Sequence, residues 1–93
     1  VDPGYHPKER VLGIEVNGRF KGYPYSELSR TTTPITEQFN GLNYRVYYDQ
    51  DTNTARATDL DNRPIVTVSS FWFAWMAFHP DSKVFTQSDL LKR

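Results

Sequence analysis

Asp49, Asp51 and Asn53 stand at alternate positions, which is the spacing that opens a calcium-binding loop. The sixth and twelfth positions of such a loop carry threonine and leucine here, in place of the turn glycine and the closing glutamate. Asp59 and Asp61, in the next predicted turn, are the oxygen ligands that could complete a different cage. Asp and Asn are also common in hairpin turns, because their side chains bond to the local backbone. The sequence therefore favours a plain turn, with at most a weak calcium or magnesium site.

His6 and His79 are the only histidines, and the chain has no cysteine. Two histidines so far apart do not make a zinc ligand set, and thiolate sites, disulfides and cysteine nucleophiles are excluded. His79 is expected to flank a helix end, where a cation is favoured. The sequence has neither a glycine-rich phosphate loop nor a nucleophile elbow. We predict no catalytic residue, no cofactor and no tight metal site.

A third candidate site lies on the predicted strand Leu42–Asp49. Asn43, Arg45 and Tyr47 alternate there with apolar and aromatic residues, so they share the outer face of a half-buried strand. Tyrosine beside arginine on a sheet surface suits stacking against a sugar, a peptide or single-stranded nucleic acid. Ordinary strand propensity also accounts for tyrosine, and Arg45 could instead pair with an acidic residue on a neighbouring strand.

Two Asn-Gly pairs, Asn17-Gly18 and Asn40-Gly41, predict β-hairpins. Two registers compete in the first hairpin. A two-residue turn places Lys21 opposite Ile14, on the apolar face. A three-residue loop with the glycine in a bulge places Phe20 there instead, and we predict this register because it keeps one face apolar.

Residues 70–80, Ser-Phe-Trp-Phe-Ala-Trp-Met-Ala-Phe-His-Pro, hold both tryptophans. The i, i+3, i+4, i+7 spacing of Phe71, Ala74, Trp75 and Phe78 predicts a helix, capped by Ser69 or Ser70 and ended by Pro80. A helix that is apolar nearly all round is expected to be buried nearly all round. We therefore predict that Trp75 and Phe78 are buried. The alternative is an exposed aromatic patch for a glycan, a lipid or a partner.

The remaining patterns complete an α+β fold. They predict an irregular lead-in over 1–10, a short helix over 24–29, strands over 35–39, 54–59, 65–69 and 83–85, and a tail over 87–93. We expect one domain, 1–93, with an antiparallel sheet of five or six short strands and the buried aromatic helix packed on one face. A small, partly closed barrel is the competing architecture.

Charge and hydropathy exclude further classes. The 93 residues include 11 basic and 11 acidic side chains, so no strong field for nucleic acid is expected. No apolar run is long enough to span a bilayer. The chain begins Val1-Asp-Pro-Gly without methionine, which indicates a piece excised from a longer protein.

Four segments resemble the C-terminal part of the domain of unknown function family 3179. They are Val11-Leu-Gly-Ile-Glu-Val-Asn-Gly18, Gly22-Tyr-Pro24, Phe71-Trp-Phe-Ala-Trp75 and Phe78-His-Pro-Asp81. The resemblance covers most of residues 8–86, and the aromatic block is its most specific piece. Members are bacterial and archaeal, many of them exported, and larger than this chain, with an earlier Cys-Pro-Leu-Cys-type motif that is absent here. The resemblance implies a family-level fold and the rest of a parent chain as partner, but no activity.

We therefore expect a non-catalytic structural or interaction module of a larger exported prokaryotic protein. One alternative is part of an enzyme or metal-dependent site that the missing N-terminal region completes. The other is carbohydrate or peptide binding on the sheet face that carries Tyr47.

Overall fold

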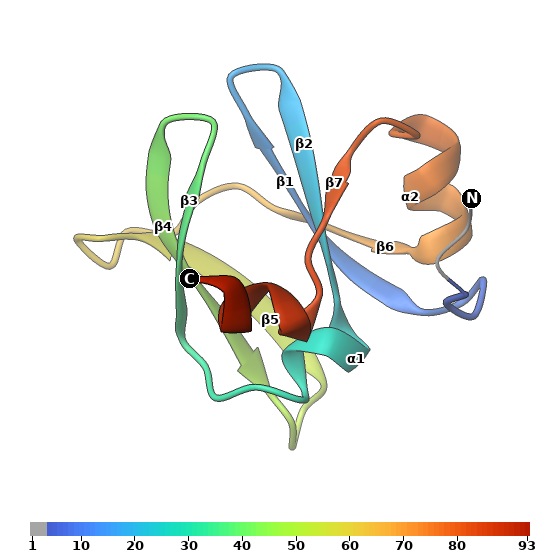
Figure 1. The fold of residues 1–93 in the computed structure, drawn as a ribbon, viewed down its shortest axis with the longest axis horizontal. Helices are drawn as coiled ribbons and strands as arrows, with labels where there is room; N and C mark the ends of the chain where they lie inside the picture. Colours follow the sequence, from blue (N-terminus) through green and yellow to red (C-terminus); the bar gives the residue numbers. More distant parts are fainter. Residues whose placement is uncertain (1–3) are drawn as a thin grey trace.

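Two β-sheets and three short helices make up residues 4–93, which the computed structural model describes (Figure 1). In chain order the elements are β1 (Arg10–Val16), β2 (Arg19–Pro24), α1 (Tyr25–Leu28), β3 (Ile35–Phe39), β4 (Leu42–Asp49), β5 (Thr54–Asp59), β6 (Val68–Phe71), α2 (Trp72–Phe78), β7 (Lys83–Val84) and a C-terminal 3-10 helix (Gln87–Lys92). The strand orders are β6-β1-β2-β7 and β3-β4-β5. The α+β class is confirmed. The single sheet of five or six strands is wrong, because seven strands form two sheets, and these do not close into a barrel within the described residues.

The first hairpin has the two-residue turn, so the predicted bulge register is wrong. Val16 faces Arg19 and Ile14 faces Lys21 across the strands. Asn17 and Gly18 both have positive φ, 49° and 81°, as a type I′ turn requires. The second hairpin turns at Asn40-Gly41 as predicted.

The register prediction failed because β1 is buried on both faces. Its even-numbered residues Leu12, Ile14 and Val16 belong to the main core between the two sheets, whereas Val11 packs with α2. A rule that assigns one face of a strand to water cannot choose a register for such a strand. Lys21 is tolerated inside because its Nζ lies 3.0 Å from a carboxylate oxygen of Glu37.

The main core joins the two sheets through alternating side chains of β1 to β4. The predicted inner face of β4 is confirmed, since Tyr44 and Val46 are buried and Leu42 and Tyr48 pack partly against the core. The buried members of this core are Leu12, Ile14, Val16, Tyr23, Tyr25, Leu28, Ile35, Phe39, Tyr44, Val46, Ala57 and Phe85.

The second core lies on the other face of β1 and β2, under α2. Gly13 and Gly22 are paired across these strands, and the Trp75 ring rests on both. A Cβ on Gly22 would lie 2.6 Å from Trp75 Nε1, and a Cβ on Gly13 would overlap the same ring. Trp75 Nε1 donates a hydrogen bond to Ser82 Oγ at 2.9 Å. The two glycines therefore make the space that the indole fills.

The aromatic helix differs from its prediction in three ways. It begins at Trp72, and no side chain caps it, because Ser69 and Ser70 belong to β6. Trp75 is buried as predicted, but Phe78 is 80% exposed. The buried side of α2 is the Trp72–Trp75 side, one position away from the predicted stripe.

The remaining boundaries differ by a few residues. The strand predicted over 65–69 lies at Val68–Phe71, and the lead-in ends where β1 starts at Arg10. The part of that lead-in over 1–3 lies outside the described residues. The predicted tail 87–93 is mostly the 3-10 helix, and β7 runs parallel to β2.

Candidate functional sites

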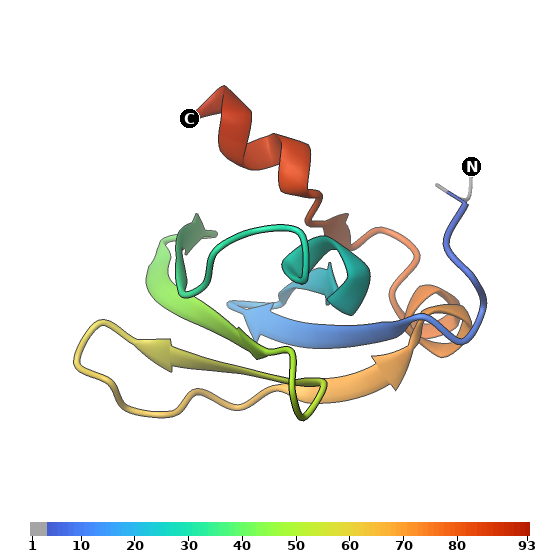
Figure 2. The same ribbon diagram turned by 90° about the horizontal axis from the view of Figure 1, so that it is seen from below.

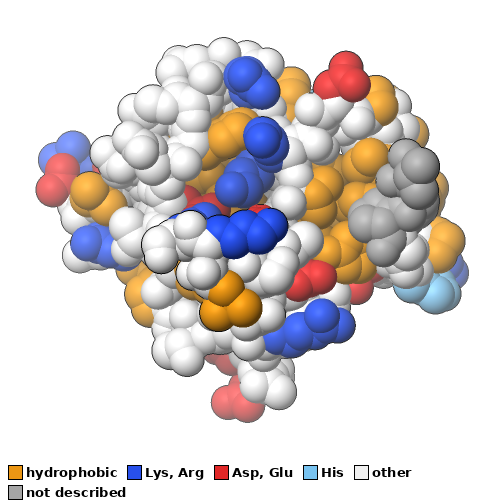
Figure 3. Space-filling model, in the orientation of Figure 1, with side chains coloured by type: hydrophobic (Ala, Val, Ile, Leu, Met, Phe, Trp, Pro, Cys, Tyr) orange, Lys and Arg blue, Asp and Glu red, His pale blue; other side chains and the backbone are white. Residues whose placement is uncertain are grey.

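The first candidate is a set of exposed apolar side chains on β6, on α2 and in the segment that leads into β6. We call this set the β6–α2 surface; its members are Val66, Val68, Phe71, Phe73 and Phe78. The rings of Phe71 and Phe73 stack with centroids 6.3 Å apart. Figure 3 shows apolar side chains reaching the surface over the part of the molecule that holds α2. The helix is therefore apolar both toward the core and toward solvent.

A small groove continues this surface past the end of α2. The groove has a volume of about 110 Å³, and Val66, Val68, Phe20, Trp75 and His79 line part of it. His79 occupies the C-cap of α2, as predicted, and its ring stacks on Phe20 at a centroid distance of 3.9 Å. The His79 imidazole thus packs as a stacked aromatic ring at the edge of the groove.

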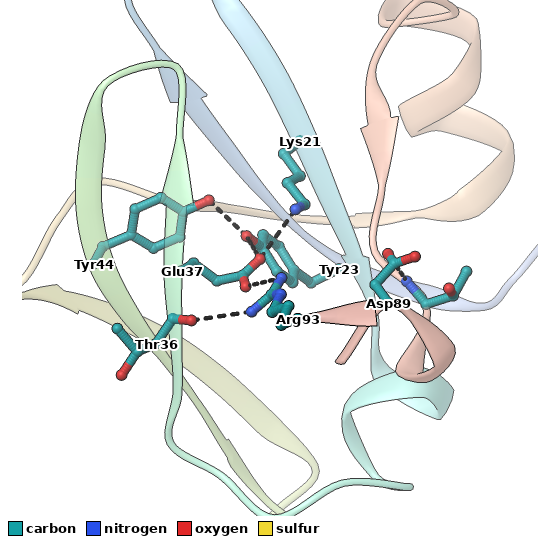
Figure 4. A network of polar contacts seen from close by, with 8 residues as sticks. Lys21, Tyr23, Thr36, Glu37, Tyr44, Asp89 and Arg93 are labelled. Atoms are coloured by element: carbon teal, nitrogen blue, oxygen red, sulfur yellow. Dashed lines mark hydrogen bonds and ion pairs between the residues drawn. The ribbon is translucent and has the colours of Figure 1, made fainter. Parts of the chain in front are cut away.

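The second candidate, centred on Glu37 of β3, was missed from the sequence (Figure 4). The Glu37 side chain is fully buried, and its Oε1 accepts hydrogen bonds from Lys21 Nζ at 3.0 Å and Tyr23 Oη at 2.8 Å. Its Oε2 is ion-paired with Arg93 at the C-terminal end. The signal was the alternation Ile35, Glu37, Phe39, which places a carboxylate on an apolar strand face.

Two tyrosines extend the Glu37 cluster into the core. Burial raises the pKa of Tyr23 far above its ordinary value, and the nearby Tyr44 and Glu37 raise it further. Burial is also the largest influence on Tyr44 and raises its pKa to about 12. Both hydroxyls are therefore protonated at neutral pH. Because Tyr23 donates to Glu37, Tyr44 must donate to Tyr23 across the 2.5 Å between their oxygens.

The third candidate is a polar cleft of about 600 Å³ between the lead-in, α1 and the C-terminal helix. Glu27 accepts hydrogen bonds there from Tyr5 Oη at 2.6 Å and from the Gln87 amide at 2.8 Å. Burial raises the pKa of Tyr5, and its bond to Glu27 adds to the rise. Glu9 accepts from the Ser26 amide at 3.0 Å. Both carboxylates thus join chain segments together, which is a structural use.

The predicted metal candidates form turns. Asp49 Oδ1 accepts hydrogen bonds from the amides of Asp51 and Thr52, and Asn53 Oδ1 accepts one from Tyr48 Oη. Among residues 4–93, no cluster of three or more His, Cys, Asp or Glu side chains could hold a metal ion. These hydrogen bonds are those of a plain turn, and the expectation that any calcium binding is at most weak stays a prediction.

The predicted ligand face of β4 does not converge on one site. Tyr47 lines a cleft of about 390 Å³, where the Arg56 guanidinium lies 4.0 Å from the centre of its ring. Arg45 Nη1 donates to the Leu60 carbonyl at 3.1 Å, and among residues 4–93 it forms no ion pair with the acidic partner considered for it. Asn43 lines a different cleft, beside Glu37. Stacking of Arg56 on Tyr47 satisfies part of the ring face that a ligand would use.

Comparison of the chain with protein-family models, curated proteins and solved structures finds no match. The helices between residues 4 and 93 are all too short or too polar to cross a bilayer.

Proposed function

We propose that the chain is a non-catalytic interaction module of a larger exported protein, and that the β6–α2 surface docks it onto another part of that protein. The observation that supports this most is the outer face of α2, where Phe73 and Phe78 are 56% and 80% exposed. Exposed apolar patches mark interaction sites, because isolated soluble domains seldom keep them in water. Here the exposed rings of Phe71 and Phe73 stack on each other where β6 passes into α2.

The position of the surface in the fold favours this use. β6 is an edge strand of its sheet, so its outer side is not paired with another strand among the described residues. Trp72 and Trp75 are buried with Val11, so they pack α2 against β1. A rigid helix that presents aromatic side chains loses little conformational entropy on binding. The segment Phe71–Trp75 is also the most specific part of the resemblance to family 3179, whose members are larger.

The test compares the isolated chain with the intact parent protein by hydrogen exchange and hydroxyl-radical footprinting. We expect residues 71–78 to be protected in the parent and reactive in the isolated chain, with the turn at Asn40-Gly41 equal in both. Phe73→Ser and Phe78→Ser should leave the isolated chain's stability within about 0.5 kcal/mol, since both side chains are exposed. Equal reactivity of 71–78 in both proteins would overturn the proposal.

A second candidate function is carbohydrate or peptide binding in the cleft beside Tyr47. The favouring observation is that Tyr47, Asp49 and Arg56 line one cleft, which combines an aromatic ring with both charges. Chemical-shift mapping with oligosaccharide and peptide sets tests it, with Tyr47→Ala as the control. Shifts confined to the β6–α2 surface would reject this candidate.

A further inference from the structure

The cleft beside Glu37 contains two hydrogen-bond acceptors that are placed to bind the two terminal nitrogens of one guanidinium group. Its volume is about 350 Å³, and it is lined by Thr36, Glu37, Gln38, Asn43 and Arg93. Arg93 Nη1 donates to the Thr36 carbonyl at 3.1 Å, and Nη2 forms the ion pair with Glu37 Oε2. Apart from that ion pair, Glu37 Oε2 is buried without a hydrogen bond from the described residues. One carboxylate oxygen and one carbonyl thus face the two arms of a guanidinium (Figure 4).

The acceptors belong to a rigid strand. Glu37 and Thr36 lie on β3, which pairs with β4 along its whole length. Lys21 and Tyr23, on β2, hold the other carboxylate oxygen of Glu37 in place. These positions are set by β2, β3 and β4, and none of them lies on the C-terminal helix. The Glu37 carboxylate and the Thr36 carbonyl should therefore keep their positions when the Arg93 side chain moves out of the cleft.

The resident guanidinium belongs to a segment with few buried side chains. The helix Gln87–Lys92 contains no buried residue, and Figure 2 shows it standing away from both sheets. Leu90 packs only partly on the core, Leu91 is 78% exposed and the Arg93 side chain is 43% exposed. Few buried apolar contacts are typical of segments that open locally at small cost in free energy.

We propose that this cleft is a binding site for an arginine side chain of another polypeptide, which Arg93 fills from within the chain. Release of Arg93 leaves a buried carboxylate with one cation in place of two, and such a group is stabilised by a replacement cation. A planar guanidinium reaches both acceptors at once, whereas an ammonium is a single compact charge. This site is separate from the β6–α2 surface and does not depend on the function proposed for it.

The test is a titration of the Arg93→Ala chain with N-acetyl-L-arginine amide, followed by the Glu37 carboxyl resonance and the Thr36 and Gln38 amides. We expect saturable shifts, smaller shifts with N-acetyl-L-lysine amide, and loss of the shifts when Glu37→Gln is added. The unaltered chain should respond more weakly because Arg93 competes.

Equal shifts with the lysine compound, shifts that survive Glu37→Gln, or no saturable shift would each overturn the proposal. If Arg93→Ala fails to fold, Arg93→Lys is titrated in its place and judged by the same outcomes. That variant keeps a cation near Glu37 but only one arm, so the arginine compound should displace it.

Discussion

The two faces of the β1–β2 hairpin treat polar and apolar side chains in opposite ways. On the main-core face, Lys21 and Tyr23 lie inside and meet a fully buried Glu37. On the other face, α2 buries two tryptophans yet leaves Phe73 and Phe78 in solvent. Hydrophobicity alone therefore does not decide burial here. A buried charge persists where its partners are built into neighbouring strands, and an aromatic residue is exposed where no element covers it.

The largest expected difference separates two aromatic residues of α2. Trp75→Ala should lower the free energy of unfolding by ~3–5 kcal/mol, because it empties the space above Gly13 and Gly22. Phe78→Ala should change it by less than about 0.5 kcal/mol, because that ring is exposed. Urea unfolding of both variants measures the pair. Comparable losses for the two would show that the far side of α2 is covered.

A matched pair of glutamates tests the main-core face. Glu37→Gln should cost about 1.5–3 kcal/mol, because it turns an acceptor of charged hydrogen bonds into a neutral group facing Lys21 and Arg93. Glu15→Gln, exposed on the opposite face of β1, should stay within about 0.5 kcal/mol. Chemical denaturation compares the unfolding free energies of the two variants. If Glu37→Gln leaves this free energy unchanged, the buried ion pairs add no stability.

Gly13→Ala should destabilise by ~1–3 kcal/mol, because the new Cβ would overlap the Trp75 ring and overpack the site. A smaller ring should relieve part of this cost, so Gly13→Ala and Trp75→Phe are expected to be coupled. A double-mutant cycle of unfolding free energies measures the coupling. Strict additivity would contradict direct packing of the indole on β1.

The last prediction concerns alkaline pH. Tyr44 has its pKa raised from 10.0 to about 12 in the folded chain, mainly by burial, so folding favours the neutral phenol. The stability this provides is complete below pH 10 and is lost as pH rises toward 12. Tyr44→Phe should flatten the decline between those values in urea unfolding. If the decline of the unfolding free energy with pH is the same in Tyr44→Phe, the Tyr44 hydroxyl is solvated and the prediction is contradicted.

The sequence predicted most local structure, because turn chemistry and alternation are local signals. The Asn40-Gly41 hairpin, the inner face of β4 and the burial of Trp75 are all confirmed. The bulge at Gly18 and the burial of Phe78 were wrong, since each depends on which neighbours cover a face, and that is tertiary information.

The candidate sites were predicted less well than the fold. Calcium-like spacing at Asp49–Asn53 leads to side chains that bond to the local turn. Glu37 was missed because its partners come from β2 and from Arg93, 56 residues further along the chain. A carboxylate in an alternating apolar strand is the one local sign of such a cluster.

Iodide quenching of tryptophan fluorescence tests the central contrast most directly. Trp72 and Trp75 are both buried, so the unaltered chain should emit at short wavelength and resist quenching. Phe78→Trp should add a component that emits at longer wavelength and is readily quenched, because position 78 faces solvent. Quenching of the unaltered chain, or a shielded tryptophan at position 78, would contradict the account of α2 as a helix buried on one face and apolar toward solvent on the other.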